Sequence, residues 1–212
     1  MKSKQRTLVM VAILGIALLN SCRKDPLNHL TNDESRIYIT NYDTTVSFSS
    51  YATFSIADSV IVIQDNQLAG HSVTAFDSTV IRLVANAMTQ AGYKQVPKTA
   101  TPDLAINISR VYNTSTAIFD YSDYWDYYGS YWDPYYWGYP GYGYYDPYAV
   151  GVYSITSGAL EIDLLDLKNA PSEGNKIRVI WTGMARGEQV FSSANASTEI
   201  AALFAQSGYL KK

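Results

Sequence analysis

The sequence predicts an α+β domain in which two helices cover one face of a largely antiparallel or mixed sheet. Several segments alternate apolar and polar residues, as half-buried strands do, and only two segments carry the apolar period of a helix. Two helices are too few to alternate with all the strands in a parallel arrangement. The chain has 212 residues, 47% of them hydrophobic, which is enough for one domain and some additional segments.

The first strands are expected shortly after residue 36, where a polar stretch gives way to β-rich sequence. Ile37–Thr40, Val46–Phe48 and Ala52–Ile56 have β-rich, partly alternating character and are predicted strands. Val60–Ile63 is a short β-branched run that is either another strand or a buried extended piece.

The strongest helix prediction covers Asp77–Ala91. Its apolar residues share one helical face at the i, i+3, i+4, i+7 spacing: Val80, Leu83, Val84, Ala87, Met88 and Ala91. Asp77 is the expected N-cap, and Gly92 is expected to end the helix in a left-handed conformation. A second, shorter helix is predicted over Glu199–Ala205, with Gly208 closing the segment.

Three strands are expected between the two helices. Asp103–Val111 and Leu160–Leu164 alternate, and Lys176–Ala185 completes the set. Residues 169–175 contain a Pro and a Gly and are expected to join the last two strands as a hairpin. In the middle strand, Glu161 and Asp163 are expected to face solvent opposite the aliphatic side chains.

Residues 121–148 have a composition unlike the rest of the chain. They hold 12 of the 19 Tyr and three of the four Trp, together with Gly, Pro and four Asp, but no Leu, Ile, Val, Met, Lys or Arg. The segment has neither a helical nor a strand period. We expect a low-complexity insertion between two strands that is presented to the outside of the domain, and the sequence leaves open the alternative that its aromatic residues fold back onto the sheet.

Three interpretations of this insertion remain open. Its rings and carboxylates are suited to binding a glycan, and Tyr-rich loops also supply contact area for protein partners. The third interpretation is a flexible loop without a specific ligand. The candidate contact residues are Trp125, Trp132, Trp137, Tyr135 and Tyr136. Nucleic acid fits poorly, because aromatic platforms for it work beside cationic grooves and this segment is anionic.

The N-terminus has the organisation of an export signal. Three basic residues within the first six precede twelve apolar residues, Leu8–Leu19, which is too short for a membrane-spanning helix of roughly 20 residues. Removal of residues 1–21 would take away three of the 16 basic residues and none of the 19 acidic ones, so the net charge would change from −3 to −6. The exported part is therefore acidic.

The only cysteine, Cys22, follows this apolar run directly. Leu19, Ser21 and Cys22 resemble the lipobox of bacterial lipoproteins, although Asn20 departs from its commonest pattern. The resemblance implies cleavage before Cys22, a diacylglycerol on its thiol and an acyl chain on its amino group. We expect residues 1–21 to be a lipoprotein signal peptide, residues 22–35 a tether, and residues 36–212 a single domain.

Composition and spacing exclude several other classes. A sequence pI near 5.3 argues against a nucleic-acid binder, and one cysteine cannot form a disulfide framework. His29 lies in the expected tether, and His71 lies in residues 68–72, which are expected to be a loop. Neither has a His, Cys or carboxylate neighbour at metal-ligand spacing, and no serine lies in a nucleophile-elbow motif. We expect no metal, no cofactor and no enzymatic activity.

Short motifs along the chain resemble a bacterial lipoprotein family catalogued as a domain of unknown function, number 4136. These motifs are Tyr51-Ala52-Thr53-Phe54, Ala91-Gly92-Tyr93, Pro102-Asp103-Leu104, residues 158–166 and residues 179–185, and the aromatic insertion lies between them in the family's order. The resemblance extends from about Ile37 to Phe204. It implies a fold and an envelope location but no catalytic residues, and within it Trp181 is expected to pack under the helices.

The sequence therefore predicts an exported, lipid-anchored, non-enzymatic envelope protein. Cys22 is the expected membrane anchor, and Arg23 in place of Asp after it favours the outer membrane, on either its periplasmic or its outer face. The expected function is that of a binding or adaptor module whose ligand the sequence does not identify, and another envelope protein is one candidate partner. The alternative is a module that uses the aromatic segment to bind peptidoglycan or a surface polysaccharide.

Overall fold

Three long neighbouring strands form the centre of the sheet in the computed structural model. They are β6 (Leu104–Tyr112), β10 (Ala159–Asp166) and β11 (Lys176–Arg186), and each pairs antiparallel with its neighbour. The structure describes residues 31, 35–64, 67–112, 119–120, 134–147, 150–151 and 158–212. Alternating apolar side chains place these three strands in the core, as the sequence predicts.

Each outer side of this centre carries two shorter strands in succession. Along β11 lie β1 (Ile37–Tyr42), which is antiparallel to it, and β8 (Gly143–Tyr145), which is parallel. Along β6 lie β2 (Thr53–Ile56) and β3 (Val60–Gln64), both parallel to β6. The sheet is therefore mixed, which confirms the predicted fold class.

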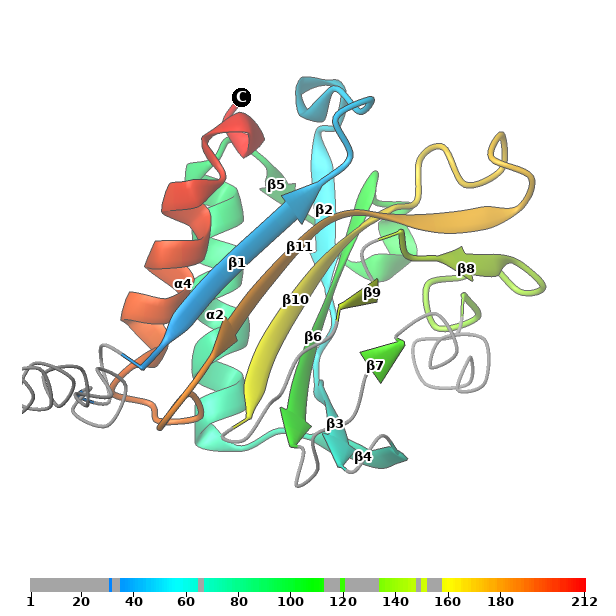
Figure 1. Ribbon diagram of the computed structural model, residues 1–212. Helices are drawn as coiled ribbons and strands as arrows, with labels where there is room; N and C mark the ends of the chain where they lie inside the picture. Colours follow the sequence, from blue (N-terminus) through cyan, green and yellow to red (C-terminus); the bar gives the residue numbers. More distant parts are fainter. Residues whose placement is uncertain are drawn as a thin grey trace, which may run out of the picture. The chain divides into compact units, whose positions relative to one another are not determined.

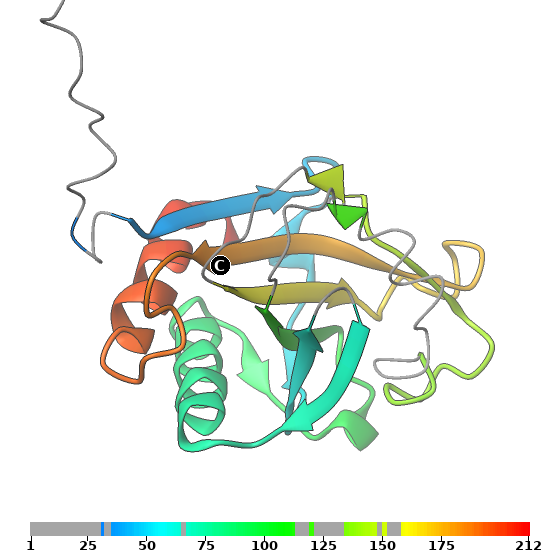
Figure 2. The same ribbon diagram turned by 60° about the horizontal axis from the view of Figure 1, so that its bottom comes forward.

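Further short strands extend one border of the sheet. β5 (Lys94–Gln95) pairs with β2, and β4 (Gln67–Ser72) forms a hairpin with β3. In Figure 2, β1 and the β3–β4 hairpin lie at opposite borders of the sheet. In the described part of the chain this sheet has nine strands, and β7 (Phe119–Asp120) and β9 (Val150–Gly151) form a separate pair.

In the residues that the structure describes, two helices cover one face of the sheet, as predicted. α2 (Ala75–Gln90) and α4 (Ala196–Gln206) lie beside one another on that face (Figure 1). Short 3-10 turns occupy Phe48–Ser50, Lys98–Ala100 and Gly208–Leu210. α2 ends before Gly92, whose φ of 103° is the left-handed conformation expected of it.

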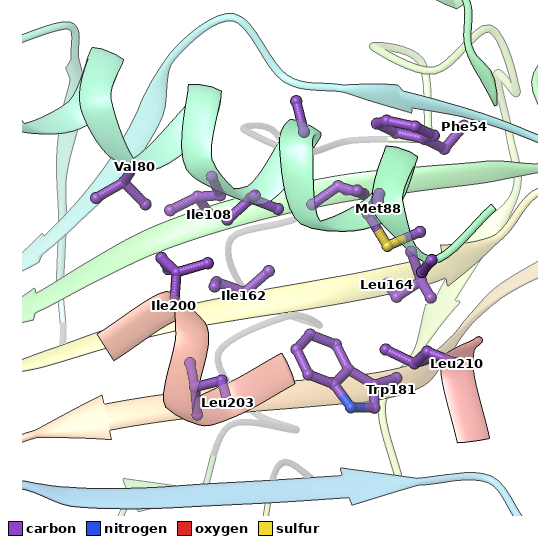
Figure 3. Packing of buried hydrophobic residues seen from close by; sticks show 14 of the residues in the cluster. Phe54, Val80, Met88, Ile108, Ile162, Leu164, Trp181, Ile200, Leu203 and Leu210 are labelled. Atoms are coloured by element: carbon purple, nitrogen blue, oxygen red, sulfur yellow. The ribbon is translucent and has the colours of Figure 1, made fainter. Parts of the chain in front are cut away.

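The main core lies between these helices and the central strands. Val80 and Met88 of α2 and Ile200 and Leu203 of α4 face apolar residues of β6, β10 and β11 (Figure 3). Trp181 is 1% exposed, and its Nε1 donates a hydrogen bond to Ser207 Oγ at 2.9 Å. The prediction that Trp181 is a core residue is confirmed.

The motifs that carry the family resemblance build a polar network at one end of the sheet. The carboxylate of Asp103 accepts the backbone N–H of Ala52 at 2.6 Å, and Thr53 Oγ1 accepts the N–H of Asp103 at 2.9 Å. The hydroxyl of Tyr51 donates to Asp166 Oδ2 at 2.7 Å. These bonds fix where β2 meets β6, which explains why these residue types occur together.

Three local predictions are wrong. Val46–Phe48 is not a strand, since Phe48 begins a 3-10 turn. Residues 68–72, which look loop-like in sequence, lie in β4. Their β propensity is weak, and the pairing with β3 stabilises them as a strand. The N-cap of α2 is Thr74, while Asp77 lies three residues later and completes a capping box.

Candidate functional site

The structure describes three of the five aromatic residues proposed as ligand contacts. Trp125 and Trp132 lie outside the described residues, as does the proposed lipidation site Cys22. Of the other three, Trp137 is 3% exposed, Tyr136 is half-buried, and Tyr135 is 72% exposed. These neighbours therefore do not form one continuous contact surface.

Residues 134–147 are part of the packed structure, which corrects the expectation that the whole insertion lies outside the core. Trp137 joins a second hydrophobic cluster with Leu165 and Val179, on the sheet face away from the helices. A turn in which Gly138 has a φ of 87° follows it, and β8 then pairs with β11. A composition without aliphatic residues hid this, because here Tyr and Trp supply the apolar area.

Tyr136 forms one wall of an open pocket of about 470 Å³ at the border of the sheet. Its hydroxyl donates to Asp58 Oδ1 at 3.2 Å, and the Nζ atom of Lys98 lies 3.7 Å from the centre of its ring. Burial raises the pKa of the Tyr136 hydroxyl above its usual value. The pocket is lined by Ser55, Ile56, Asp58, Gln95, Val96, Pro97, Lys98 and Tyr136.

The residues around Asp58 contain Ser, His and Asp but not in a catalytic order. Ser59 Oγ lies 3.0 Å from His71 Nδ1 and 3.5 Å from Asp58 Oδ1, so the serine stands between the imidazole and the carboxylate. Activation of a serine requires the imidazole in the middle. Burial lowers the pKa of His71, which the nearby Asp58 opposes. We interpret these contacts as ordering the β3–β4 hairpin.

A row of polar side chains crosses the second face of the sheet. Asn107, Asp163 and Thr182 lie opposite one another on β6, β10 and β11, and all three are buried. Glu161 is buried as well, so the expectation that Glu161 and Asp163 face solvent is wrong. The reason is that both faces of the sheet are covered. Burial raises the pKa of Asp163 well above its usual range, and Asp146 adds to the effect.

Among the described residues, no group of three or more His, Cys, Asp and Glu side chains is arranged to hold a metal ion. Within the same residues, no helix is both long enough and apolar enough to cross a membrane.

Sequence reasoning missed most of the pocket. Its lining comes from three places in the chain, residues 55–58, residues 95–98 and Tyr136, which only the pairing of β2 with β5 and the fold of the aromatic segment bring together. Asp58, Gln95 and Lys98 are ordinary surface residues in sequence. The one available signal is Pro97, which cannot donate to a strand ladder and therefore occurs at the end of an edge strand.

The fold and the site define a small α+β domain with a pocket at its sheet border. The chain belongs to the family described as a domain of unknown function, DUF4136, whose model matches residues 39–207. This confirms the resemblance drawn from the short motifs. No curated protein matches the chain.

One solved structure supports this assignment. A DUF4136 family protein from Bacteroides thetaiotaomicron is 30% identical, with a TM-score of 0.68, and the match covers 84% of this chain and 99% of that one. PelC from Paraburkholderia phytofirmans, a dodecamer, is 9% identical with a TM-score of 0.39, and the match covers 83% of this chain and 99% of that one. That second likeness is too low to support an argument.

Proposed function

We propose that the protein is an exported, lipid-anchored protein of the bacterial outer membrane whose domain binds a partner and catalyses no reaction. The observation that carries the anchoring is the position of the only cysteine. Cys22 lies directly after twelve apolar residues and behind the small residue Ser21. Lipidation explains both facts together, since two or more acyl chains give stable membrane attachment.

The pocket supports binding as the role of the domain. It is open, and its Tyr136 wall is held at the hydroxyl by Asp58 and on the ring by Lys98. A wall that is already ordered loses little conformational entropy when a ligand arrives. The order of Ser59, His71 and Asp58 supports a role without catalysis, because the serine and not the imidazole stands in the middle.

Glycan binding is the second candidate, and the polar lining of the pocket favours it. Ser55, Gln95 and Asp58 offer hydrogen-bonding groups for sugar hydroxyls. However, the Lys98 ammonium group already lies over the ring of Tyr136, so stacking of a sugar on that face requires displacement of a cation–π contact. A protein partner therefore fits the pocket better.

Replacement of Cys22 tests the anchor. Cys22→Ser removes the thiol that would carry the diacylglycerol, and we expect the protein to move from the membrane fraction to the soluble fraction. Ser21→Ala is the matched control, since it keeps a small residue next to an intact Cys22 and should leave the protein in the membrane. Fractionation and metabolic labelling with a radioactive fatty acid measure both variants. Membrane retention of a processed Cys22→Ser protein would refute the proposal.

A further inference from the structure

The border of the sheet beside β2 is left open after two residues of pairing. β5 pairs with β2 only at Thr53 and Phe54, and the last bond runs from the Val96 N–H to the Phe54 carbonyl at 2.9 Å. Pro97 has no N–H to continue the ladder, and the chain turns into the 3-10 turn Lys98–Ala100. The pairing therefore stops while β2 continues.

The backbone groups of Ile56 face this open border. Successive residues of a strand direct their N–H and C=O groups to opposite sides. The Phe54 carbonyl faces β5, and the Ala57 N–H faces β6, where it donates to the Ile106 carbonyl at 3.0 Å. Ile56 must therefore present its N–H and C=O on the β5 side. In the described part of the chain, no backbone hydrogen bond continues the β2–β5 ladder to Ile56.

The pocket lies at this border rather than over one face of the sheet. It is lined by both Ser55 and Ile56, whose side chains point to opposite faces because they are consecutive strand residues. Ile56 packs against the core under the helices, whereas Tyr136 packs against the cluster on the other face. The space of about 470 Å³ is therefore aligned with the unpaired backbone of β2.

An extended peptide suits this border better than a sugar does. An unpaired strand edge presents a donor and an acceptor at every second residue, and the backbone of another strand offers the matching pair. The open part of β2 is Ser55 and Ile56, because the strand ends at Ile56, so an added strand pairs there with the N–H and C=O of Ile56. At the pocket, Lys98 and Asp58 present opposite charges that select the side chains of such a strand.

We infer that the open border of β2 at Ser55 and Ile56 binds an extended segment of a partner protein, which adds to the sheet as a further strand. The segment carries an acidic side chain next to Lys98 and a basic one next to Asp58. This inference rests on the proposed function, because it specifies how the binding module takes its partner.

A library of random linear peptides displayed on phage provides the probe. The full-length protein, purified in detergent, is the target, and selected sequences are synthesised as free peptides. We expect a bound peptide to slow hydrogen exchange of the Ile56 amide, which faces the open border. We also expect N-methylation of the peptide residues whose N–H groups face β2 to weaken binding about tenfold, while methylation of the alternate residues has little effect.

Charge reversal tests the selectivity. Lys98→Glu should weaken binding of the selected acidic peptides about tenfold and shift new selections towards basic residues at that place. Lys94→Glu is the matched control, since Lys94 belongs to β5, is exposed and does not line the pocket. It introduces the same change of charge four residues before Lys98. We expect it to leave the affinity for the selected peptides within about twofold of that of the parent.

Several outcomes would overturn the inference. They are the absence of any enriched peptide, protection at amides remote from β2, or equal effects of the two sets of N-methyl groups. Binding of soluble peptidoglycan fragments in place of peptides, with loss on Lys98→Glu, would assign the pocket to glycans instead. None of these results depends on Cys22, so a failed anchor and a failed peptide site are distinguishable.

Discussion

Glu199 shows how one buried residue couples stability to pH. It lies in the first turn of α4 with 0% exposure, and its Oε1 is 4.0 Å from Arg36 Nε. In the described part of the chain neither carboxylate oxygen has a hydrogen-bond partner. Burial raises the pKa of Glu199 from its usual 4.5 to about 7, although Arg36 opposes the shift.

The sign of the pH dependence follows from this shift. The folded protein holds the proton of Glu199 more tightly than the unfolded chain does. Its contribution to stability is therefore fully present below about pH 4.5 and is lost as the pH rises towards 7. We expect Glu199→Gln to be more stable than the parent at about pH 8 and to lose that advantage at about pH 4.

Urea midpoints of both proteins at several pH values test this prediction. Glu188→Gln is the control, because Glu188 is exposed and should give a pH-independent difference. A Glu199→Gln midpoint that follows the parent at every pH would contradict the prediction.

At the scale of the element, α2 depends on the capping box that begins it. Thr74 Oγ1 accepts the backbone N–H of Asp77 at 3.2 Å, and Asp77 Oδ2 accepts the backbone N–H of Thr74 at 2.8 Å. Because Thr74→Ala leaves the first turn with an unsatisfied N–H, we expect a loss of about 1 kcal/mol in the free energy of unfolding. Ser78→Ala, at an exposed helical position, should cost nothing. Equal losses in chemical denaturation would show that the cap contributes no stability.

The elements with a strong period could be predicted from sequence, and those held by their neighbours could not. α2, α4 and the three central strands carry their own apolar pattern, so each was predicted within a few residues. β4 has no such pattern: Gly70, with a φ of 135°, lies where the register of β3 and β4 shifts. Asp77 was given the cap because it is the residue type that caps helices most often, but Thr74 three residues earlier satisfies the same N–H groups.

At the scale of the whole molecule, the sheet is covered on both faces. The helices cover one face, and residues 134–147 cover part of the other. The helical layer could be predicted from the sequence, because both helices have a regular spacing of apolar residues. The layer formed by residues 134–147 was not predicted, because its aromatic residues have no period. The pairing of β8 with β11 is what brings them to their partners on the sheet. The candidate pocket could not be predicted for the same reason, because its wall at Tyr136 belongs to residues 134–147.

Neighbouring aromatic residues test whether residues 134–147 belong to the core. Trp137 is 3% exposed and Tyr135 is 72% exposed, although both lie in one turn. We expect Trp137→Ala to lower the free energy of unfolding by about 3 kcal/mol because it opens a cavity. Tyr135→Ala, the matched control, should change it by less than about 0.5 kcal/mol. Similar small effects in thermal denaturation would show that the segment does not contribute to the core.

The order of the strands also sets how the domain responds to tension. The chain enters through β1 at one border, whereas the open border of β2 lies near the other, beside β5. Five strand spacings, about 24 Å, separate β1 from β5. If the proposed anchor holds the N-terminus and the proposed partner strand is bound at β2, a pull between them runs across the ladders rather than along the strands. Among the ladders of the domain that carry this force, the one between β2 and β6 has only three paired residues, and we expect it to break first. The partner would then be released while the central strands remain paired.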